Sequence, residues 1–261
     1  MKILVFIKQI PGTDEVRLDE KTGNLLRDGV ESVINPIDKN AIEAALELRD
    51  ANGGTVTAIT MGPPQAAAVL NRALYMGCDD VRLLSDRSFG GADTLATGYV
   101  LAKAAEKFGD YDLLVFGQYS ADADTAQTGP IVAEFLGIPH VSLVNSISVK
   151  GDWLYCYRAL SGAVERVRVK LPALITVTRE ANTPRFQTPG NVLRGLKVEK
   201  TVWNSESLNC DEAQIGVAGS PSKTKRVFAP PARAADTQYF SGDAEDVAAA
   251  FVELLKNEHL V

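Results

Sequence analysis

The sequence has few of the side chains on which most catalytic and metal centres depend. Among 261 residues there are two histidines, His140 and His259, and three widely spaced cysteines that form no CxxC. The histidine count argues against a Ser-His-Asp triad or a multi-histidine metal centre. The cysteine pattern argues against a disulfide framework, a zinc site or an iron–sulfur site. We therefore predict no catalytic residue and no metal ligand in this chain.

Longer signals are absent as well. No apolar run approaches the about 20 residues that a membrane-spanning helix needs, and the sequence contains neither GxGxxG, nor GxxxxGK[ST], nor GxSxG. The apolar run after Met1 is interrupted at Lys8, and no small-residue cleavage site follows, which predicts a first β-strand rather than a signal peptide. A net charge of −6 argues against nucleic acid as the main partner. We expect a cytoplasmic protein without membrane insertion.

What is present is an alternation of short apolar strands and amphipathic helices. Strands are predicted at 2–8, 55–61, 81–85 and 111–117, with helices between them, and a fifth strand begins at 140. A hairpin excursion is predicted at 15–29. This order is typical of a doubly wound, mostly parallel sheet with helices on both faces, which is a Rossmann-like α/β fold of the kind that binds adenine nucleotides.

The second half follows a different pattern. Three consecutive strands with period-2 character are predicted from 152 to 179, and we expect them to extend the sheet as antiparallel strands. Residues 179–200 are expected to form a loop. We divide the chain into an α/β nucleotide-binding domain, 1–215, and a C-terminal arm with an amphipathic helix, 216–261. Such an arm either docks on a partner or folds back on its own sheet, and the sequence does not distinguish these two arrangements.

Two polar loops follow neighbouring predicted strands, where sheets of this kind bind their ligands. The segment "GQYSADADTAQTGP", residues 117–130, exceeds the about two to six residues of an ordinary connection. The segment "DRSFGGADTLAT", residues 86–97, places Gly90 and Gly91 before a second polar helix start. Free N–H groups at helix starts bind phosphate. Each acid or threonine could be only a turn former or a helix cap, but the whole set favours a nucleotide.

Five motifs in order resemble the β subunit of electron transfer flavoproteins, namely "INPIDKNAIEAALEL", "ITMGPPQA", "SDRSFGGADTLAT", "DADTAQTGP" and "PRFQTPGNVLRGLK". The resemblance covers essentially the whole chain. It implies a heterodimer with an α subunit that carries the electron-transferring FAD, and an adenine nucleotide in the β subunit. That nucleotide is AMP in simple respiratory members. In electron-bifurcating members it is a second FAD, which passes electrons from NADH to ferredoxin or flavodoxin and to a flavin-dependent dehydrogenase.

The loops and the resemblance together predict a set of cofactor-binding residues and a recognition loop. The cofactor-binding residues expected are Phe6, Asn35, Asp38, Met61, Gly62, Gly91, Asp93, Thr94, Thr97, Ala121, Asp122, Asp124, Thr125, Ala126, Gln127, Thr128 and Gly129. The recognition loop, about residues 182–198, is expected to contact the partner dehydrogenase through Arg185, Phe186, Val192 and Leu193.

The identity of the nucleotide is left between two candidates. Gly90, Gly91 and Ala121 make room for a pyrophosphate, which favours FAD and electron bifurcation. Tyr119, where the family often has a different pattern, either stacks on a flavin ring or fills its space and leaves only AMP. A rival of another class is an ATP-binding sensor or ATP-utilising enzyme on a similar sheet.

Overall fold

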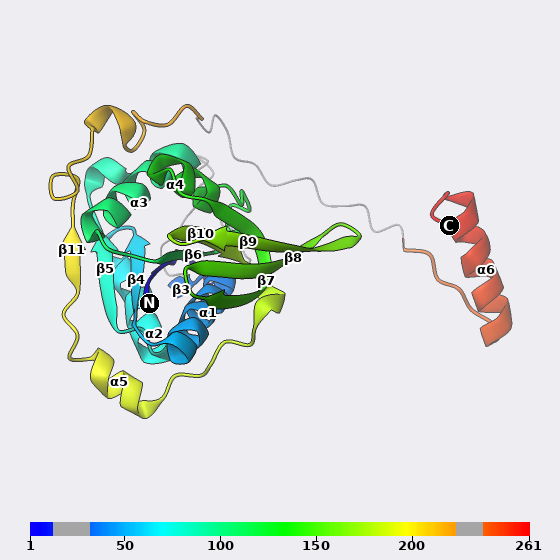
Figure 1. Cartoon of the computed structure of the whole chain (residues 1–261). Coiled ribbons are helices and arrows are strands. Elements are labelled where there is room, and N and C mark those ends of the chain that lie inside the picture. The colour runs from blue at the N-terminus through cyan, green and yellow to red at the C-terminus, as the bar shows by residue number, and fades with distance from the viewer. Residues whose placement is uncertain (13–31, 223–236) are drawn as a thin grey trace. The chain divides into compact units, whose positions relative to one another are not determined.

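The computed structural model describes residues 1–12, 32–222 and 237–261 of the chain. The chain divides into two compact units, Met1–Lys225 and Arg226–Val261 (Figure 1). The hairpin predicted at 15–29 lies outside the described residues.

The first unit is built on one mixed sheet. In spatial order its nine strands are β11 (Thr201–Trp203), β5 (Asp80–Leu84), β4 (Thr55–Met61), β1 (Lys2–Phe6), β6 (Leu113–Gly117), β10 (Ala173–Val177), β7 (His140–Lys150), β8 (Trp153–Leu160) and β9 (Ala163–Lys170). Neighbours from β11 to β7 are parallel, and β8 and β9 are antiparallel additions. The chain builds outward from β1 first toward β5 and then toward β7, which confirms the predicted doubly wound fold.

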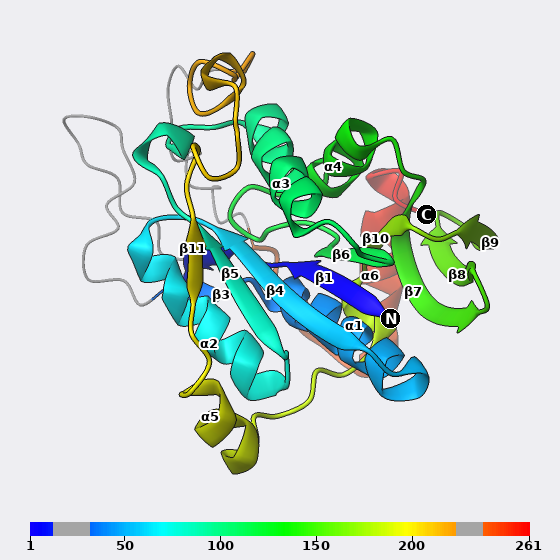
Figure 2. The same cartoon turned by 60° about the vertical axis from the view of Figure 1, so that its left-hand side comes forward.

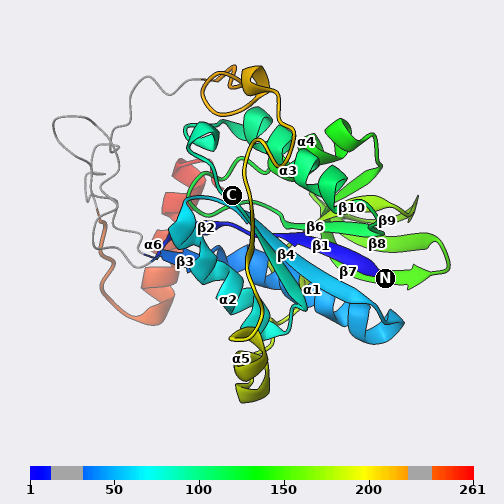
Figure 3. The same cartoon turned by 90° about the vertical axis from the view of Figure 1, so that its left-hand side faces the viewer.

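Helices cover both faces of the sheet (Figures 2 and 3). α1 (Pro36–Asn52) and α2 (Ala67–Met76) pack on one face, and α3 (Thr94–Phe108) and α4 (Thr128–Leu136) pack on the other. Each face therefore has its own apolar cluster, one containing Ile42 and Leu70 and the other containing Val100 and Val132. Because both faces are covered, the central strands are nearly continuous apolar runs.

One expected strand pairs differently from the prediction. The segment at 173–179 was expected to be antiparallel, but β10 lies between β6 and β7 and is parallel to both. All five of its residues are buried, so this strand needs cover on both faces, which an outer antiparallel position would not provide. The bend of β7 coincides with Leu143, whose φ of 63° accompanies a shift in register.

The segment expected to be a loop at 179–200 contains a helix. α5 (Pro189–Gly195) begins after Thr188, whose side chain accepts a hydrogen bond from the N–H of Asn191. Gly195 packs closely on α2, with Leu74 and Tyr75 beside it. The prediction was wrong because seven residues are too few for the apolar periodicity of a helix to stand out.

Smaller elements complete the first unit. β2 (Gln9–Pro11) and β3 (Ser32–Ile34) pair as an antiparallel two-stranded sheet. Short 3-10 helices occupy Pro64–Ala66, Arg87–Phe89, Arg179–Ala181 and Glu212–Gln214. Residues after β11 return to the sheet, since Leu208 and Ile215 are buried in the same cluster as α3 and α4.

The second unit contains α6 (Ala244–Asn257), as its amphipathic sequence predicts. Asp243 caps its start by accepting a hydrogen bond from the N–H of Asp246. Phe251 packs edge-on against Phe240, with the ring centroids 6.0 Å apart, and remains 48% exposed. Across the described ranges, no helix is both long enough and apolar enough to span a membrane.

Candidate functional site

A cavity of about 650 Å³ opens at the carboxyl ends of β1, β4 and β6. Its floor is apolar, because Phe6 and Phe116 stand on adjacent strands and stack with centroids 4.5 Å apart and planes 9° apart. Ile59, Met61 and Leu101 also line it. The volume lies within the about 300–1,000 Å³ of small-molecule sites. The cavity is where a doubly wound sheet is expected to bind its ligand.

The starts of α3 and α4 meet at the rim of the cavity. Thr94, the first residue of α3, donates a hydrogen bond from its hydroxyl to Oε1 of Gln127, the residue before α4, at 3.1 Å. The side chain of Gln127 makes no capping bond to α4. Among the described residues, the N–H groups of Thr128 and Gly129 have no hydrogen-bonding partner, and the helix dipole at this start favours an anion.

The start of α3 is occupied by its own acid. One carboxylate oxygen of Asp93 accepts hydrogen bonds from the N–H groups of Leu95 and Ala96, and the other accepts one from Ser222 at 3.0 Å. Desolvation alone would raise the pKa of Asp93, but these backbone donors hold it below its usual value. Asp93 is therefore a helix cap, which was one of the two roles left open for it, and it also lines the cavity.

A buried polar cluster forms the opposite wall. Nδ2 of Asn35 donates to Oδ1 of Asp38 at 2.9 Å and to the carbonyl of Tyr119 at 2.9 Å, and its Oδ1 accepts from the N–H of Ala121 at 3.1 Å. Oδ2 of Asp38 accepts from the N–H of Lys8 at 2.6 Å. The "NPID" turn thus ties the end of β1 to the loop after β6. Burial raises the pKa of Asp38 to about 7, against the lowering effect of these donors.

Lys8, which follows β1, lines the cavity. Its ammonium nitrogen lies 2.8 Å from Oδ1 of Asp122 and 3.3 Å from the hydroxyl of Ser120. Partial burial alone would raise the pKa of Asp122, but the hydrogen bond and charge of Lys8 lower it. The ion pair with Asp122 therefore holds the ammonium group of Lys8 beside the cavity.

Most of the predicted cofactor-binding residues come together at this cavity. Those on its lining are Phe6, Asn35, Asp38, Met61, Gly91, Asp93, Thr94, Thr97, Thr125, Ala126, Gln127, Thr128 and Gly129. Gly62, Ala121, Asp122 and Asp124 are not among the lining residues. Phe89 and Phe116 also line the cavity, and sequence reasoning did not single them out. Gln118, which lies beside Tyr119 in the segment that departs from the family pattern, lines it as well. Ser222 reaches the cavity because its stretch is tied to Asp93: the N–H of Ser222 donates to Oδ2 of Asp93, and the hydroxyl of Ser220 accepts from the N–H of Asp93.

Gly129 has a packing role at the start of α4. A Cβ atom at this position would lie 2.8 Å from the Thr176 side chain and 3.4 Å from that of Leu174 on β10. Gly129 therefore allows α4 to approach the sheet closely, whatever its N–H group binds.

The predicted recognition residues divide into anchored and exposed ones. Arg185 forms ion pairs with the buried carboxylate of Glu43 at 2.9 Å and with Asp50 at 2.9 Å, both on α1. Phe186 is 93% exposed and Leu193, on α5, is 64% exposed. Neither apolar side chain tucks under the segment, and Arg185 is held by its own subunit.

Fold and cavity together define an α/β protein of the doubly wound class, with a cavity at the carboxyl edge of its sheet. The model of the electron transfer flavoprotein domain matches residues 22–204. The chain belongs to the electron transfer flavoprotein family, as a β subunit, because full-length relatives of that name align along its whole length.

Three relatives illustrate the similarity. The electron transfer flavoprotein subunit beta of Clostridium acetobutylicum is 42% identical over 261 residues, which is 100% of both chains. The caffeyl-CoA reductase-Etf complex subunit CarD of Acetobacterium woodii is 40% identical over 262 residues, again 100% of both chains. Protein FixA of Azorhizobium caulinodans is 40% identical over 242 residues, covering 90% of this chain and 86% of that protein.

Proposed function

We propose that the cavity at the ends of β1, β4 and β6 binds FAD and that the chain works in a heterodimer with an electron transfer flavoprotein α subunit. The observation that carries this proposal is the uncapped start of α4, which faces a 650 Å³ cavity beside the start of α3. An anion at this position is held by backbone N–H groups, and the first turn of α4 contains no acidic residue to compete with it.

Residues of this chain can contact the phosphates and the apolar ring systems of FAD. Thr94, Gln127 and Thr128 supply polar groups next to the α4 start for phosphate oxygens. Asn35 and Asp38 hold the loop after β6 in place, and Phe6 offers an apolar wall. Bound FAD would supply one- and two-electron chemistry, while the protein binds, orients and shields it. This division of labour fits a chain for which we predict no catalytic side chain.

AMP is the alternative ligand, and one observation favours it. Tyr119 lines the cavity beside Gln118 and Ser120. The ring of a tyrosine at this position either stacks on a flavin or fills the space into which a flavin would extend, and the second case leaves room for AMP alone. AMP would leave this chain a structural role and place the only flavin in the α subunit.

We propose further that electrons come from NADH and are divided between ferredoxin or flavodoxin and a flavin-dependent dehydrogenase. The similarity to a subunit of a complex named for caffeyl-CoA reductase supports a dehydrogenase-type partner. Phe186, Val192 and Leu193 are proposed to contact it, with Arg185 positioning them. Residues 216–261 are proposed to dock on the α subunit, and the complex is proposed to work in the cytoplasm.

Nucleotide content tests the proposal directly. The full chain is purified with its α subunit, and the acid-released nucleotides are separated by chromatography. Two FAD per heterodimer support the proposal, and one FAD with one AMP selects the simple carrier. NADH should then reduce ferredoxin only when the dehydrogenase and its acceptor are present. Turnover of ATP by the chain alone would select the rival class, an ATP-utilising enzyme.

A further inference from the structure

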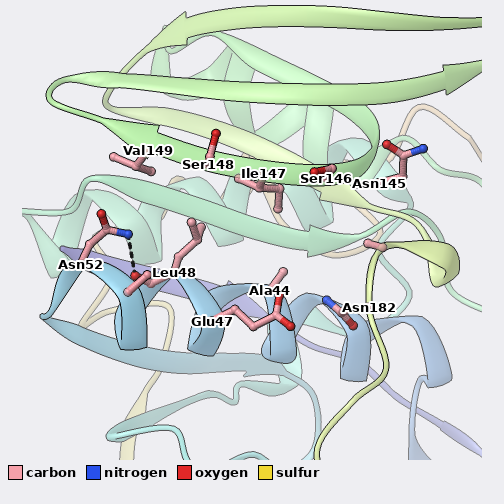
Figure 4. Close-up of a pocket in the computed structure, with 12 residues that line it drawn as sticks. Ala44, Glu47, Leu48, Asn52, Asn145, Ser146, Ile147, Ser148, Val149 and Asn182 are labelled. Carbon is pink, nitrogen blue, oxygen red and sulfur yellow. Dashed lines mark hydrogen bonds between the residues drawn. The ribbon is translucent and has the colours of Figure 1, made fainter.

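The chain that leaves β10 is fixed to α1 where the recognition loop begins. Nδ2 of Asn40, a buried residue of α1, donates hydrogen bonds to the carbonyl of Arg179 at 3.1 Å and to that of Asn182 at 2.9 Å. The side chain of Asn182 donates in return to the carbonyl of Asn40 at 3.0 Å. Figure 4 shows Asn182 beside α1, where it lines a groove of about 330 Å³ between α1 and β7.

Three residues further on, a buried carboxylate of α1 receives Arg185. Glu43 is 5% exposed, and its carboxylate accepts hydrogen bonds from the backbone N–H of Arg185 at 2.9 Å and from Nε of the same residue at 2.9 Å and 3.0 Å. No other described residue donates a hydrogen bond to this carboxylate. A charge buried on α1 is therefore satisfied by one residue of the recognition loop.

Further charges connect Arg185 to the far end of the loop. Arg185 also pairs with Asp50 at 2.9 Å, and Asp50 pairs with Arg49 at 2.8 Å. Arg49 lies 3.1 Å from one oxygen of Asp79, and Arg194 of α5 lies 3.8 Å from the other. We call these residues the charged clamp, which consists of Glu43, Arg49, Asp50, Asp79, Arg185 and Arg194.

Between its fixed points the recognition loop exposes large apolar side chains. Phe186 is 93% exposed, Leu193 64% and Leu196 67%. The backbone that carries them is held, because Thr188 caps α5 and a Cβ atom on Gly195 would lie only 3.0 Å from a side chain of α2. Exposed apolar anchors on an ordered backbone are typical of a binding surface that is formed before its partner arrives.

Stability alone does not account for the buried part of the clamp. The attraction within a buried ion pair often only offsets the desolvation of its two charges, and an apolar pair of similar volume is commonly as stable. Exposed pairs such as that of Arg185 with Asp50 add little. What Glu43 supplies is a fixed geometry, because three charge-assisted hydrogen bonds constrain both the distance and the direction of the Arg185 backbone and side chain.

We propose that Glu43 is a positioning residue, which acts through Arg185 to hold the recognition loop in a preformed arrangement that presents Phe186, Leu193 and Leu196 to a flavin-dependent dehydrogenase. This inference rests on the proposed function, because it concerns the surface assigned to that partner. A loop that is ordered in the free protein loses little conformational entropy when the partner binds, so the clamp raises the affinity for the partner without contacting it.

The test compares Glu43→Gln with Glu106→Gln in the full chain, assembled with its α subunit. Both changes remove a paired carboxylate from a helix, but Glu106 pairs with Lys103 within α3. An acyl-CoA dehydrogenase is the probe, and its KM and kcat for the heterodimer are measured. Glu43→Gln should raise the KM about fivefold or more and leave kcat within about twofold, and the control should change neither. Hydrogen exchange at 183–196 should become faster only in Glu43→Gln.

A double variant separates position from stability. Glu43→Leu with Arg185→Met replaces the ion pair by an apolar pair, so the free energy of unfolding should recover relative to Glu43→Leu alone. The fixed geometry is not restored, and we expect the KM to stay raised and exchange at 183–196 to stay fast.

The outcomes that overturn the inference differ from those that overturn the proposed function. Recovery of both KM and stability in the double variant would leave Glu43 a structural role alone. An unchanged KM in Glu43→Gln, with or without faster exchange, also removes the positioning role. If the wild-type heterodimer exchanges no electrons with the dehydrogenase, the proposed function itself fails and this inference falls with it.

Discussion

The starts of α3 and α4 face one cavity, yet they differ in what occupies their N–H groups. Asp93 fills the start of α3 with its own carboxylate and also holds Ser222. At α4 the side chain of Gln127 leaves the start uncapped and instead accepts a hydrogen bond from Thr94. The two Gly-rich motifs look alike in sequence, but one already holds an anion and the other is free to bind one. The predictions below test that difference.

The largest effect is expected from Gly129→Val. The added side chain would meet Thr176 and Leu174 on β10, so α4 could not keep its close approach to the sheet. Overpacking of this kind costs about 2–3 kcal/mol in the free energy of unfolding. Denaturant titration measures the loss. Gly190→Ala, at a helical glycine with nothing within 4 Å of the added atom, is the control and should change stability by less than about 1 kcal/mol. A fully stable Gly129→Val chain would contradict the packing role of this glycine.

Asp38→Asn should change how stability depends on pH. Burial raises the pKa of Asp38 to about 7, so the native state binds more protons than the unfolded state between about pH 4 and pH 7. This group therefore lowers the free energy of unfolding as pH rises through that window. In the Asp38→Asn variant this loss is absent. The free energy of unfolding of the variant relative to that of wild type should therefore rise with pH, by up to about 1.4 kcal/mol per pH unit within this window.

Denaturant titrations at about pH 5, 6 and 7 measure this slope. Asp122→Asn is the matched control, because Lys8 lowers the pKa of Asp122 and its contribution is lost only below the usual carboxyl range. Parallel stability profiles for wild type and Asp38→Asn would contradict the prediction.

Gln127→Asp makes the start of α4 resemble that of α3. The new carboxylate would cap the helix and repel a phosphate, so nucleotide affinity should fall about tenfold or more. Stability of the nucleotide-free chain should hold or rise. Gln127→Asn offers the same cap without the charge, and it should retain more nucleotide after gel filtration. Equal retention by the two variants would mean that phosphate does not bind at α4.

Asp93→Ala tests the occupied start. Loss of the cap and of the bond to Ser222 should cost about 1–2 kcal/mol in the free energy of unfolding. Because the pKa of Asp93 is lowered, its contribution is present above the usual carboxyl range and is lost as pH falls through the folded value. Thermal unfolding at neutral and acidic pH measures both. A loss of stability that persists unchanged at acidic pH would argue against the cap.

The smallest effect is expected from Leu193→Ala, which contrasts an exposed residue with the anchored Arg185. The side chain is 64% exposed, so the fold should be unaffected. Electron delivery to the partner dehydrogenase should slow by about two- to fivefold, with flavin content unchanged. Val202→Ala, also exposed at 55%, is the control. Equal slowing by both variants would remove Leu193 from the interface.

Local sequence patterns predicted the central strands and the helices, because these elements depend on the periodicity of neighbouring residues. Continuous apolar runs predicted β1, β4 and β6. Thirteen of the predicted site residues line one cavity since they follow strands that end at the same edge of the sheet. The short α5 and the parallel pairing of β10 were missed because strand order and brief helices depend on contacts far along the chain.

The sequence by itself determined the doubly wound class and the family, because periodicity and motif order are properties of the chain. The tertiary structure alone decided what each polar group does. It brings Ser222 to Asp93, Glu43 to Arg185 and Asp122 to Lys8. It also sets Thr176 against Gly129 and so gives that glycine a packing role. Free donors and satisfied donors have the same letters in a sequence, and only the folded arrangement separates them.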